Sequence, residues 1–488
     1  MTTNNAAFVP PWARWTLATV LGLTLLRLAV LKVSPLDLLP DEAQYWSWSR
    51  DFAFGYFSKP PLIAWLIAAT TKLAGDMEYG VRLSSPLCHA VAAFALYRLG
   101  ATLGDGRLGF WSALTYATLP GVTFSSTLIS TDAPLLAAWA VALLAYVEAP
   151  KAPTIRWSAM LGLSIGIGFL AKYAMAYFVV AAALHALWSR DARGFWLSKR
   201  GLLAVAIALL CIAPNVIWNA TNGWATFGHT AANAAWNDSA TDTEGALPWI
   251  GSQFGVFGPI LLGALLVRIA LLRRHPADLT ERFLLCFTLT PLVIVLVQAV
   301  IARAHANWAA PAYVAGSVWA VRWLLATGRK RIAAASIVLH LAVMLVFYVY
   351  AAGVATMPLP KVLDAPLAFR RGWSSMARDV RNRSYELPYA SIITVDRKTM
   401  AALTYYLRDH PAPLVIIPTG PVPGNQFELT QPIDAKTGAH GLLVLPFEGD
   451  SPVTQRFEKA DAVGRLFQRI GTGRQRVYRY LEVTGFKG

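Results

Sequence analysis

Two adjacent carboxylates, Asp41 and Glu42, follow directly after an apolar run of membrane length, and Lys59 comes after them in a Ser-Lys-Pro-Pro corner. A carboxylate can serve as a general base toward a hydroxyl or amine, and its neighbour can orient it or bind a metal ion. The prolines fix the backbone, so the lysine ammonium can be aimed at a phosphate. The segment predicts a reaction site, with helix capping by Asp41 and interfacial snorkelling by Lys59 as open alternatives.

Three further cations stand near the ends of apolar segments. They are Arg82, Lys172 and Arg303. Charge at membrane depth is costly and marks a functional candidate, and several cations together can hold an anionic lipid headgroup. Each of them alone can instead be an interfacial anchor, so the prediction rests on the set.

Other polar residues are predicted to support the same site. They are Tyr45, Tyr56, Asp132, His229, His305 and Asn307. Asp132 also fits the N-terminus of a helix, where a carboxylate is favoured by the helix dipole. His229 and His305 have the chemistry of acid/base groups or metal ligands, but neither has a closely spaced His or Cys partner. No cofactor is therefore firmly predicted, and a divalent metal stays an open alternative.

The elements that must position these residues are membrane helices. Of the 488 residues, 56% are hydrophobic and only 14% are charged. Apolar windows of roughly 17 to 25 residues, the length that crosses about 30 Å of hydrocarbon, recur along the chain. The net charge of +16 comes from basic residues scattered between these windows, whereas a nucleic-acid-binding protein gathers them on one domain. The composition predicts an all-α polytopic protein in a lipid bilayer, with no nucleic-acid partner.

About eleven transmembrane helices are predicted from the window length. They cover approximately residues 15–33, 80–100, 108–124, 133–148, 157–171, 174–188, 201–218, 249–271, 283–301, 308–325 and 332–351. Alternating the loops places most basic residues on one side, which the positive-inside rule assigns to the cytoplasm together with the N-terminus. The candidate site then lies on the opposite, external side of the membrane. The apolar segment 61–69 is too short to span and is predicted to lie in the interface.

Two domains are predicted. Residues 1–355 form the transmembrane module, with a large first external loop at 34–79, and residues 356–488 form a small external α/β domain. Buried strands are expected at 391–396, 414–417 and 442–445, with a helix at 398–407 between the first two. No catalytic motif stands out in the second domain, which suggests substrate gating or scaffolding.

The first loop, with Asp41-Glu42 and Lys59-Pro60-Pro61-Leu62, resembles that of the membrane-embedded GT-C glycosyltransferases. The nearest resemblance is to bacterial relatives of the protein O-mannosyltransferases and of the lipid A aminoarabinose transferases, glycosyltransferase families 39 and 83. Further landmarks occur in family order over roughly residues 15–350: Ser130-Thr131-Asp132-Ala133-Pro134, Gly168-Phe169-Leu170-Ala171-Lys172-Tyr173, Ala213-Pro214-Asn215 and His305-Ala306-Asn307-Trp308.

This resemblance implies that Asp41 is catalytic and that Lys59 and Lys172 contact the donor phosphate, with Arg303 as a further phosphate ligand by position. The aminoarabinose transferases usually carry Glu where this chain has Ser58. That departure argues against a metal site of their kind and against aminoarabinose as the sugar.

The implied activity is the inverting transfer of one sugar from a polyprenyl-phosphate donor to an envelope acceptor, without a nucleotide. The resemblance also implies that this takes place in a bacterial inner membrane, with the first loop and the C-terminal domain on the periplasmic side. Acceptor candidates are lipid A or its core, another envelope glycolipid or glycan, and protein; the sugar and the oligomeric state are left open. The competing hypotheses are a secondary transporter or flippase of lipid-linked sugar, because polytopic helices with buried charge also serve transport, and a nonenzymatic receptor or assembly factor. A transporter would place its polar residues near the membrane midplane, whereas here they gather toward one face.

Overall fold

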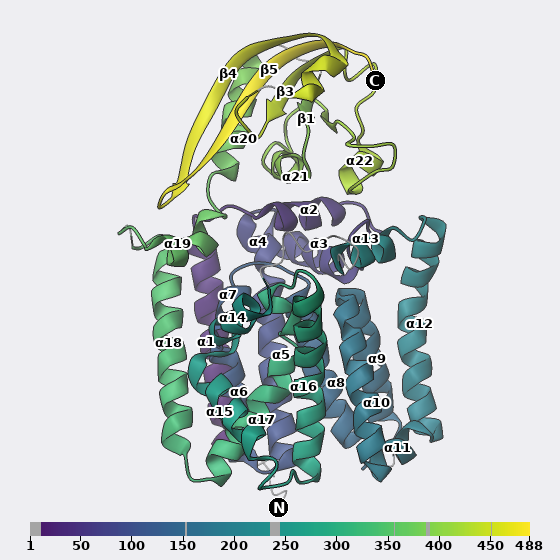
Figure 1. The fold of residues 1–488 in the computed structure, drawn as a ribbon, viewed down its shortest axis with the longest axis vertical. Coiled ribbons are helices and arrows are strands. Elements are labelled where there is room, and N and C mark those ends of the chain that lie inside the picture. The colour runs from purple at the N-terminus through teal and green to yellow at the C-terminus, as the bar shows by residue number, and fades with distance from the viewer. Residues whose placement is uncertain (1–10, 152–153, 235–244, 356, 387–390, 450) are drawn as a thin grey trace, which may run out of the picture. The chain divides into compact units, whose positions relative to one another are not determined.

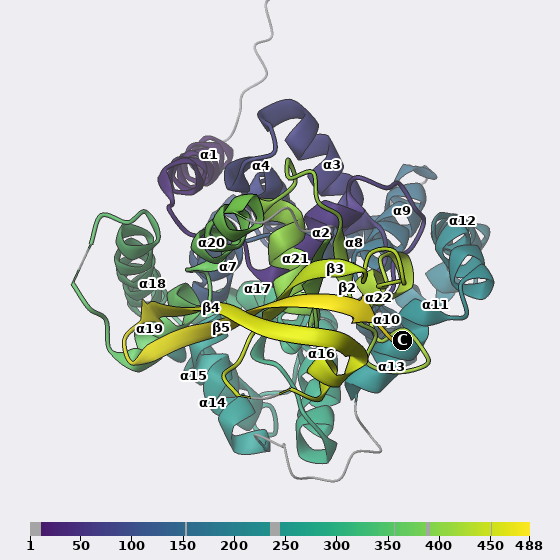
Figure 2. The same ribbon diagram turned by 90° about the horizontal axis from the view of Figure 1, so that it is seen from above.

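The computed structural model describes residues 1–488 except 1–10, 152–153, 235–244, 356, 387–390 and 450. It is mostly helical and carries one small sheet near the C-terminus (Figures 1 and 2), as the sequence predicts. Two compact units make up the chain. The helical unit comprises Met1–Lys32, Lys59–Ile63 and Arg82–Val349, and the sheet-containing unit comprises Val33–Ser58, Ala64–Val81 and Tyr350–Gly488.

The helical unit is built from a series of helices. They are α1 (Pro11–Val33), α5 (Ser84–Leu103), α6 (Gly106–Thr118), α7 (Pro120–Ser125), α8 (Asp132–Glu148), α9 (Arg156–Ala171), η1 (Tyr173–Met175), α10 (Ala176–Trp188), α11 (Arg190–Trp196), α12 (Lys199–Thr221), α13 (Ala225–Ala234), α14 (Ala246–Phe257), α15 (Pro259–Leu271), α16 (Leu279–Ile301), η2 (Ala306–Ala309), α17 (Ala312–Ala326) and α18 (Lys330–Ala351).

Length and apolar composition identify the helices that can cross a membrane alone. Within the described residues there are five such helices: α1, the continuous stretch Glu78–Leu103, α12, α16 and α18. The bent pair α14 and α15 would add a sixth, and four shorter apolar helices are also present. The chain is therefore a multi-pass membrane protein, while the predicted number of about eleven spans and their sidedness stay predictions.

Two stretches predicted as single helices are each broken in two. Residues 108–124 divide into α6 and α7 because Pro120 forces the preceding Leu119 into extended backbone, with φ −49° and ψ 138°. Residues 249–271 divide into α14 and α15, which are bent by 114°. The bend falls at Gly258, whose φ of +89° favours glycine, and an added Cβ there would lie 2.1 Å from His340 Nε2.

Replacing Gly258 by Ala is expected to destabilise the helical unit by about 2 kcal/mol or more, because the Cβ meets both a disfavoured backbone conformation and the His340 ring. Thermal unfolding of the detergent-solubilised chain measures the effect. Gly263→Ala is the matched control, since a Cβ at Gly263 in α15 meets nothing within 4 Å. An unfolding temperature for Gly258→Ala equal to that of the control would refute the explanation of the bend.

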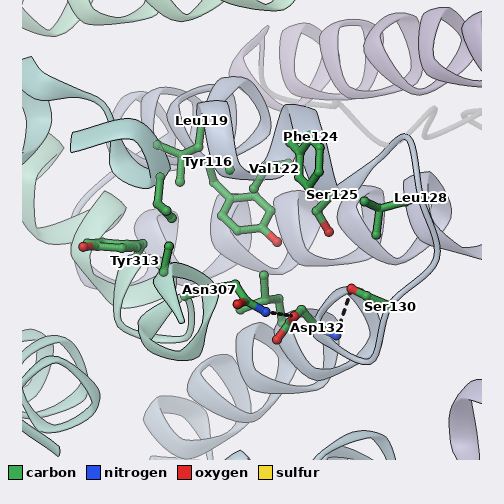
Figure 3. A pocket seen from close by; sticks show the side chains of 15 residues that line it. Tyr116, Leu119, Val122, Phe124, Ser125, Leu128, Ser130, Asp132, Asn307 and Tyr313 are labelled. Atoms are coloured by element: carbon green, nitrogen blue, oxygen red, sulfur yellow. Dashed lines mark hydrogen bonds between the residues drawn. The ribbon is translucent and has the colours of Figure 1, made fainter. Parts of the chain in front are cut away.

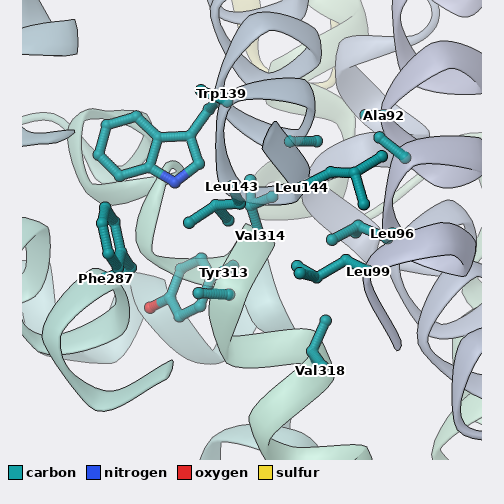
Figure 4. Close-up of a cluster of buried hydrophobic side chains, with 14 of the residues drawn as sticks. Ala92, Leu96, Leu99, Trp139, Leu143, Leu144, Phe287, Tyr313, Val314 and Val318 are labelled. Carbon is teal, nitrogen blue, oxygen red and sulfur yellow. The ribbon is translucent and has the colours of Figure 1, made fainter. Parts of the chain in front are cut away.

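The core of the helical unit surrounds α8, which is buried along nearly its whole length. A helix that is apolar on all sides belongs in the interior of a bundle. Figure 4 shows Trp139 of α8 beside Phe287 of α16 and Tyr313 of α17, with aliphatic side chains filling the space between the helices. This packing holds the N-terminus of α8, where Asp132 lies, in a fixed position.

The sheet-containing unit has five strands in the order β2-β1-β3-β5-β4. The strands are β1 (Ser391–Thr394), β2 (Leu414–Ile416), β3 (His440–Leu445), β4 (Phe457–Gly471) and β5 (Arg474–Phe486). The helices of the unit are α2 (Pro40–Trp48), α3 (Leu62–Ala74) from Ala64 on, α4 (Glu78–Arg82) up to Val81, α19 (Lys361–Ala368), α20 (Trp373–Glu386), α21 (Arg397–Tyr406), α22 (Gln426–Thr430) and η3 (Pro452–Arg456). β1 pairs in parallel with β2 and β3, and β5 pairs antiparallel with β3 and β4.

One face of this sheet is covered by α20 and α21. The first helix contributes Met376 and Val380, which are fully buried against strand residues such as Ile392 and Leu442. The three predicted strands and the helix between the first two are confirmed. The long β4–β5 hairpin was not predicted, because its alternation places charged residues on an exposed face.

His410, in the turn after α21, provides a pH test of this unit. Its Nδ1 accepts the Ala412 N–H at 3.2 Å and its Nε2 lies 2.7 Å from Ser384 Oγ, an arrangement that needs a neutral ring. Burial, and secondarily the Arg381 guanidinium, lower the pKa of His410. The native state therefore favours the neutral ring, so stability is full above the unfolded-state pKa of about 6.5 and is lost as pH falls below it.

We expect the unfolding temperature of the full chain to fall between pH 7.5 and pH 5, and His410→Gln, which keeps a donor and an acceptor without titrating, to reduce that fall. Differential scanning fluorimetry between pH 5 and pH 7.5 measures the unfolding temperature of both proteins. Identical pH dependence in the two proteins would contradict the assignment.

Candidate active site

The predicted first-loop carboxylates lie at the start of α2. Leu39 is extended and Pro40 occupies the first helical position, which suits its fixed φ. The Glu42 side chain is buried and its Oε2 accepts the Leu39 N–H at 2.8 Å, so this carboxylate caps its own helix. Asp41 points away from that cap and its side chain is 59% exposed. The two neighbouring acids therefore have different surroundings, one fixed and one accessible.

Asp41 is held by a residue of α21 that the sequence did not single out. Arg397 Nη1 donates to Asp41 Oδ1 at 2.7 Å and also to the side-chain oxygen of Gln44. The two acceptors are three positions apart on α2, so they share one face of the helix. No local sequence signal marks Arg397, because the contact joins segments more than 350 positions apart.

The aromatic residues of the first loop brace α2. Tyr45 is buried and packs on Trp48, and Trp48 stacks on Tyr56 with ring centroids 4.9 Å apart. The Tyr56 hydroxyl lies 2.7 Å from the Asp51 carbonyl, and burial raises the pKa of Tyr56 to about 12. Tyr56 is thus a neutral phenol that stabilises the loop by donating to its backbone.

In the helical unit, Asp132, Lys172 and Asn307 come together. Lys172 Nζ lies 2.7 Å from Asp132 Oδ1, and Asn307 Nδ2 donates to Asp132 Oδ2 at 2.6 Å. The Lys172 and Asp132 side chains are only 20% and 10% exposed. The Asp132 carboxylate therefore joins three segments that are distant in sequence: the start of α8, the end of α9 and η2.

The position of Lys172 follows from local backbone geometry. It ends α9 with extended backbone, φ −162° and ψ 134°, and its N–H still bonds to the Gly168 carbonyl at 2.9 Å. The next residue, Tyr173, donates its hydroxyl to Asn215 Oδ1 at 2.8 Å and accepts from Asn219 at 3.3 Å. This polar network on α12 fixes the break in the helix that aims the lysine.

A cavity of about 370 Å³ opens beside Asp132 and Asn307. Figure 3 shows Ser130, Asp132 and Asn307 along one wall, with apolar side chains such as Leu119 and Phe124 along the other. An apolar cavity with a few convergent polar groups is the usual form of a small-molecule site. Its dimensions and lining suit a ligand with one polar end and one hydrocarbon part.

The other predicted residues occupy varied environments. In the helical unit, Lys59 is partly buried, Arg82 is 1% exposed, and Arg303 lies exposed in the segment that leads to η2. His305 is exposed with its ring against Trp308, and His229 is partly buried on α13. Within the described residues, no group of three or more His, Cys, Asp or Glu side chains could hold a metal ion.

The helical unit is a multi-pass module with a charged cluster beside an apolar cavity, and it is joined in sequence to a small α/β domain. This combination is typical of the membrane-embedded GT-C glycosyltransferases. ArnT from Cupriavidus metallidurans in the apo state superimposes with a TM-score of 0.67, covering 96% of this chain and 97% of that chain at 15% identity. That likeness establishes the fold.

Sequence comparison identifies the family. Residues 58–218 match the dolichyl-phosphate-mannose-protein mannosyltransferase model. A lipid A galacturonosyltransferase, RgtD of Rhizobium johnstonii, is 35% identical over 395 residues, which cover 80% of this chain and 82% of that protein. The undecaprenyl phosphate-alpha-4-amino-4-deoxy-L-arabinose arabinosyl transferase of Pseudomonas paraeruginosa is 32% identical over 197 residues, 36% of this chain and 35% of that protein.

The chain belongs to the bacterial GT-C glycosyltransferase family that contains these two sugar transferases. The resemblance found in the sequence is thereby confirmed, as is the prediction that the protein is a glycosyltransferase. These relatives give no support to the transporter hypothesis.

Proposed function

We propose that this enzyme transfers one sugar from an undecaprenyl-phosphate-type donor to lipid A, at the periplasmic face of a bacterial inner membrane. The observation that carries the proposal is the 35% identity to a lipid A galacturonosyltransferase over 80% of the chain. It supports lipid A as the acceptor and galacturonic acid as the first sugar to test. The arabinosyl transferase relative supports undecaprenyl phosphate as the carrier.

The proposed topology follows from the charge distribution. The N-terminus lies in the cytoplasm, and the first loop and the C-terminal α/β domain at 356–488 lie in the periplasm. The acceptor and the sugar-bearing phosphate then meet on the periplasmic face, where no nucleotide is available. A lipid-linked sugar is therefore the appropriate donor.

The proposed mechanism divides the work between a base and a set of cations. Asp41 accepts the proton of the acceptor hydroxyl while that oxygen forms a bond to the anomeric carbon. The bond from the anomeric carbon to the phosphate oxygen breaks, and undecaprenyl phosphate leaves with the electron pair. Attack opposite the leaving group inverts the anomeric configuration.

The leaving phosphate needs positive charge around it. Lys59, Lys172, Arg82 and Arg303 are the proposed donors to its oxygens, and they lower the barrier by stabilising the charge that develops there. One N–H of the Lys172 ammonium is directed at Asp132, which orients the side chain. Glu42 acts through its helix cap, by holding the turn that carries Asp41.

Mass spectrometry of lipid A tests the proposal in cells. Cells that carry the intact chain are compared with cells that carry Asp41→Asn at matched expression and with cells that carry neither. We expect a single sugar increment on lipid A only with the intact chain. An increment on another glycolipid or on protein would overturn the acceptor, and equal profiles in all three would overturn the function.

A further inference from the structure

The inference concerns Arg397, in the first turn of α21. Asp396 caps this helix, since its Oδ1 accepts the N–H groups of Lys398 at 2.9 Å and Thr399 at 3.0 Å. The cap fixes the start of the helix and hence the backbone from which the arginine extends.

The guanidinium of Arg397 bonds to Asp41 Oδ1 at 2.7 Å and also to the oxygen of Gln44, which is buried. A guanidinium is planar and rigid, so a second bond to a fixed amide determines the direction of the first. The arginine therefore orients the Asp41 carboxylate more strictly than one ion pair would.

Other contacts already hold α2 against α21. Trp46 meets Tyr405 edge to face with ring centroids 5.0 Å apart, and the Tyr405 hydroxyl donates to the Asp76 carbonyl at 2.6 Å. Leu38 N–H bonds to the Tyr406 hydroxyl at 2.8 Å. The two helices thus pack together through these aromatic residues whether or not Arg397 is present.

The ion pair itself adds little stability, because the Arg397 and Asp41 side chains are 33% and 59% exposed. Exposed pairs of this kind contribute little to folding stability, because water and salt screen the two charges. The Arg397–Asp41 ion pair therefore contributes little to the stability of the fold, although it involves the more accessible of the two carboxylates of α2. This points to a role other than stabilisation.

We propose that Arg397 is a positioning residue for Asp41, so that the C-terminal domain takes part in the transfer reaction. The inference rests on the proposed role of Asp41 as the base. Arg397 holds Oδ1, which leaves Oδ2 to accept the proton of the acceptor hydroxyl.

The test compares Arg397→Ala, Arg397→Lys and Asp41→Asn in the purified full chain, with Lys398→Ala as the matched control because that neighbouring side chain is exposed. We expect Arg397→Ala to lower kcat about tenfold with the donor KM unchanged. Arg397→Lys should restore part of kcat, because lysine keeps a positive charge that can bond to Asp41, and Lys398→Ala should behave as the unaltered chain.

A normal kcat for Arg397→Ala would overturn the inference. So would a loss of kcat that comes with a raised donor KM and no rescue by lysine, which indicates a structural role only. Should Arg397→Ala fold poorly, Arg397→Gln takes its place, and a normal kcat for that variant overturns the inference. If Asp41→Asn itself remains active, the proposed role of Asp41 as the base fails instead, and if the unaltered chain transfers no sugar, the proposed function fails, so these failures are distinguishable.

Discussion

The Asp41→Asn enzyme is expected to transfer sugar roughly 10²- to 10⁴-fold more slowly than the unaltered enzyme, which is the usual contribution of a general base. The amide keeps the size of the carboxylate and an oxygen that Arg397 can reach, but it cannot take the acceptor proton. Because Asp41 is exposed, its loss leaves the unfolding temperature nearly unchanged. Initial rates with purified chain, donor and acceptor measure the effect.

Asp51→Asn is the matched control, since this acid lies exposed in the same loop and the substitution keeps the backbone carbonyl that accepts from Tyr56. Full activity is expected for this variant. A rate for Asp41→Asn within about twofold of the control would remove Asp41 from the chemistry, because that difference is under 1 kcal/mol in the barrier.

Lys172→Met is predicted to lower the transfer rate roughly 10²- to 10³-fold, the cost of removing one donor to a developing negative charge. It should also destabilise the protein by about 2 kcal/mol, because the Asp132 carboxylate, 10% exposed, loses its cation. Rate measurements and thermal unfolding of the same preparation separate the two effects.

Two further variants distinguish catalysis from folding. Asp132→Asn combined with Lys172→Met removes both charges, so stability should recover while the rate stays low. Lys72→Met, an exposed lysine on α3, should change neither quantity. If the double variant regains activity together with stability, Lys172 acts only through folding and the phosphate contact is wrong.

Much of the helical fold could be predicted because apolar length and helix breakers act locally. The expected helix at 133–148 appears as Asp132–Glu148, and that at 283–301 as Leu279–Ile301. The expected helix at 249–271 was wrong as a single element, because the bend at Gly258 depends on a left-handed conformation and on His340, which is distant in sequence. Glycine in an apolar run does not by itself indicate a bend.

Part of the site could be predicted, because some of its residues are polar or charged side chains next to apolar membrane segments. Asp132, Lys172 and Asn307 were singled out separately, and the structure joins them at one carboxylate. Arg397 and Gln44 were missed, since an ordinary arginine in a small α/β domain carries no signal until the fold brings it to Asp41. Contacts between residues so far apart in the sequence are determined by tertiary packing. Hydrophobic periodicity and secondary-structure propensity carry no information about such packing.

The most direct test of the account is transfer by the purified chain in liposomes that contain undecaprenyl-phosphate galacturonic acid and lipid A, followed by NMR of the product. The account predicts one galacturonic acid on lipid A, with anomeric configuration opposite to that in the donor, and one undecaprenyl phosphate released for each transfer. Retained configuration, or transfer that persists in Asp41→Asn, would contradict it.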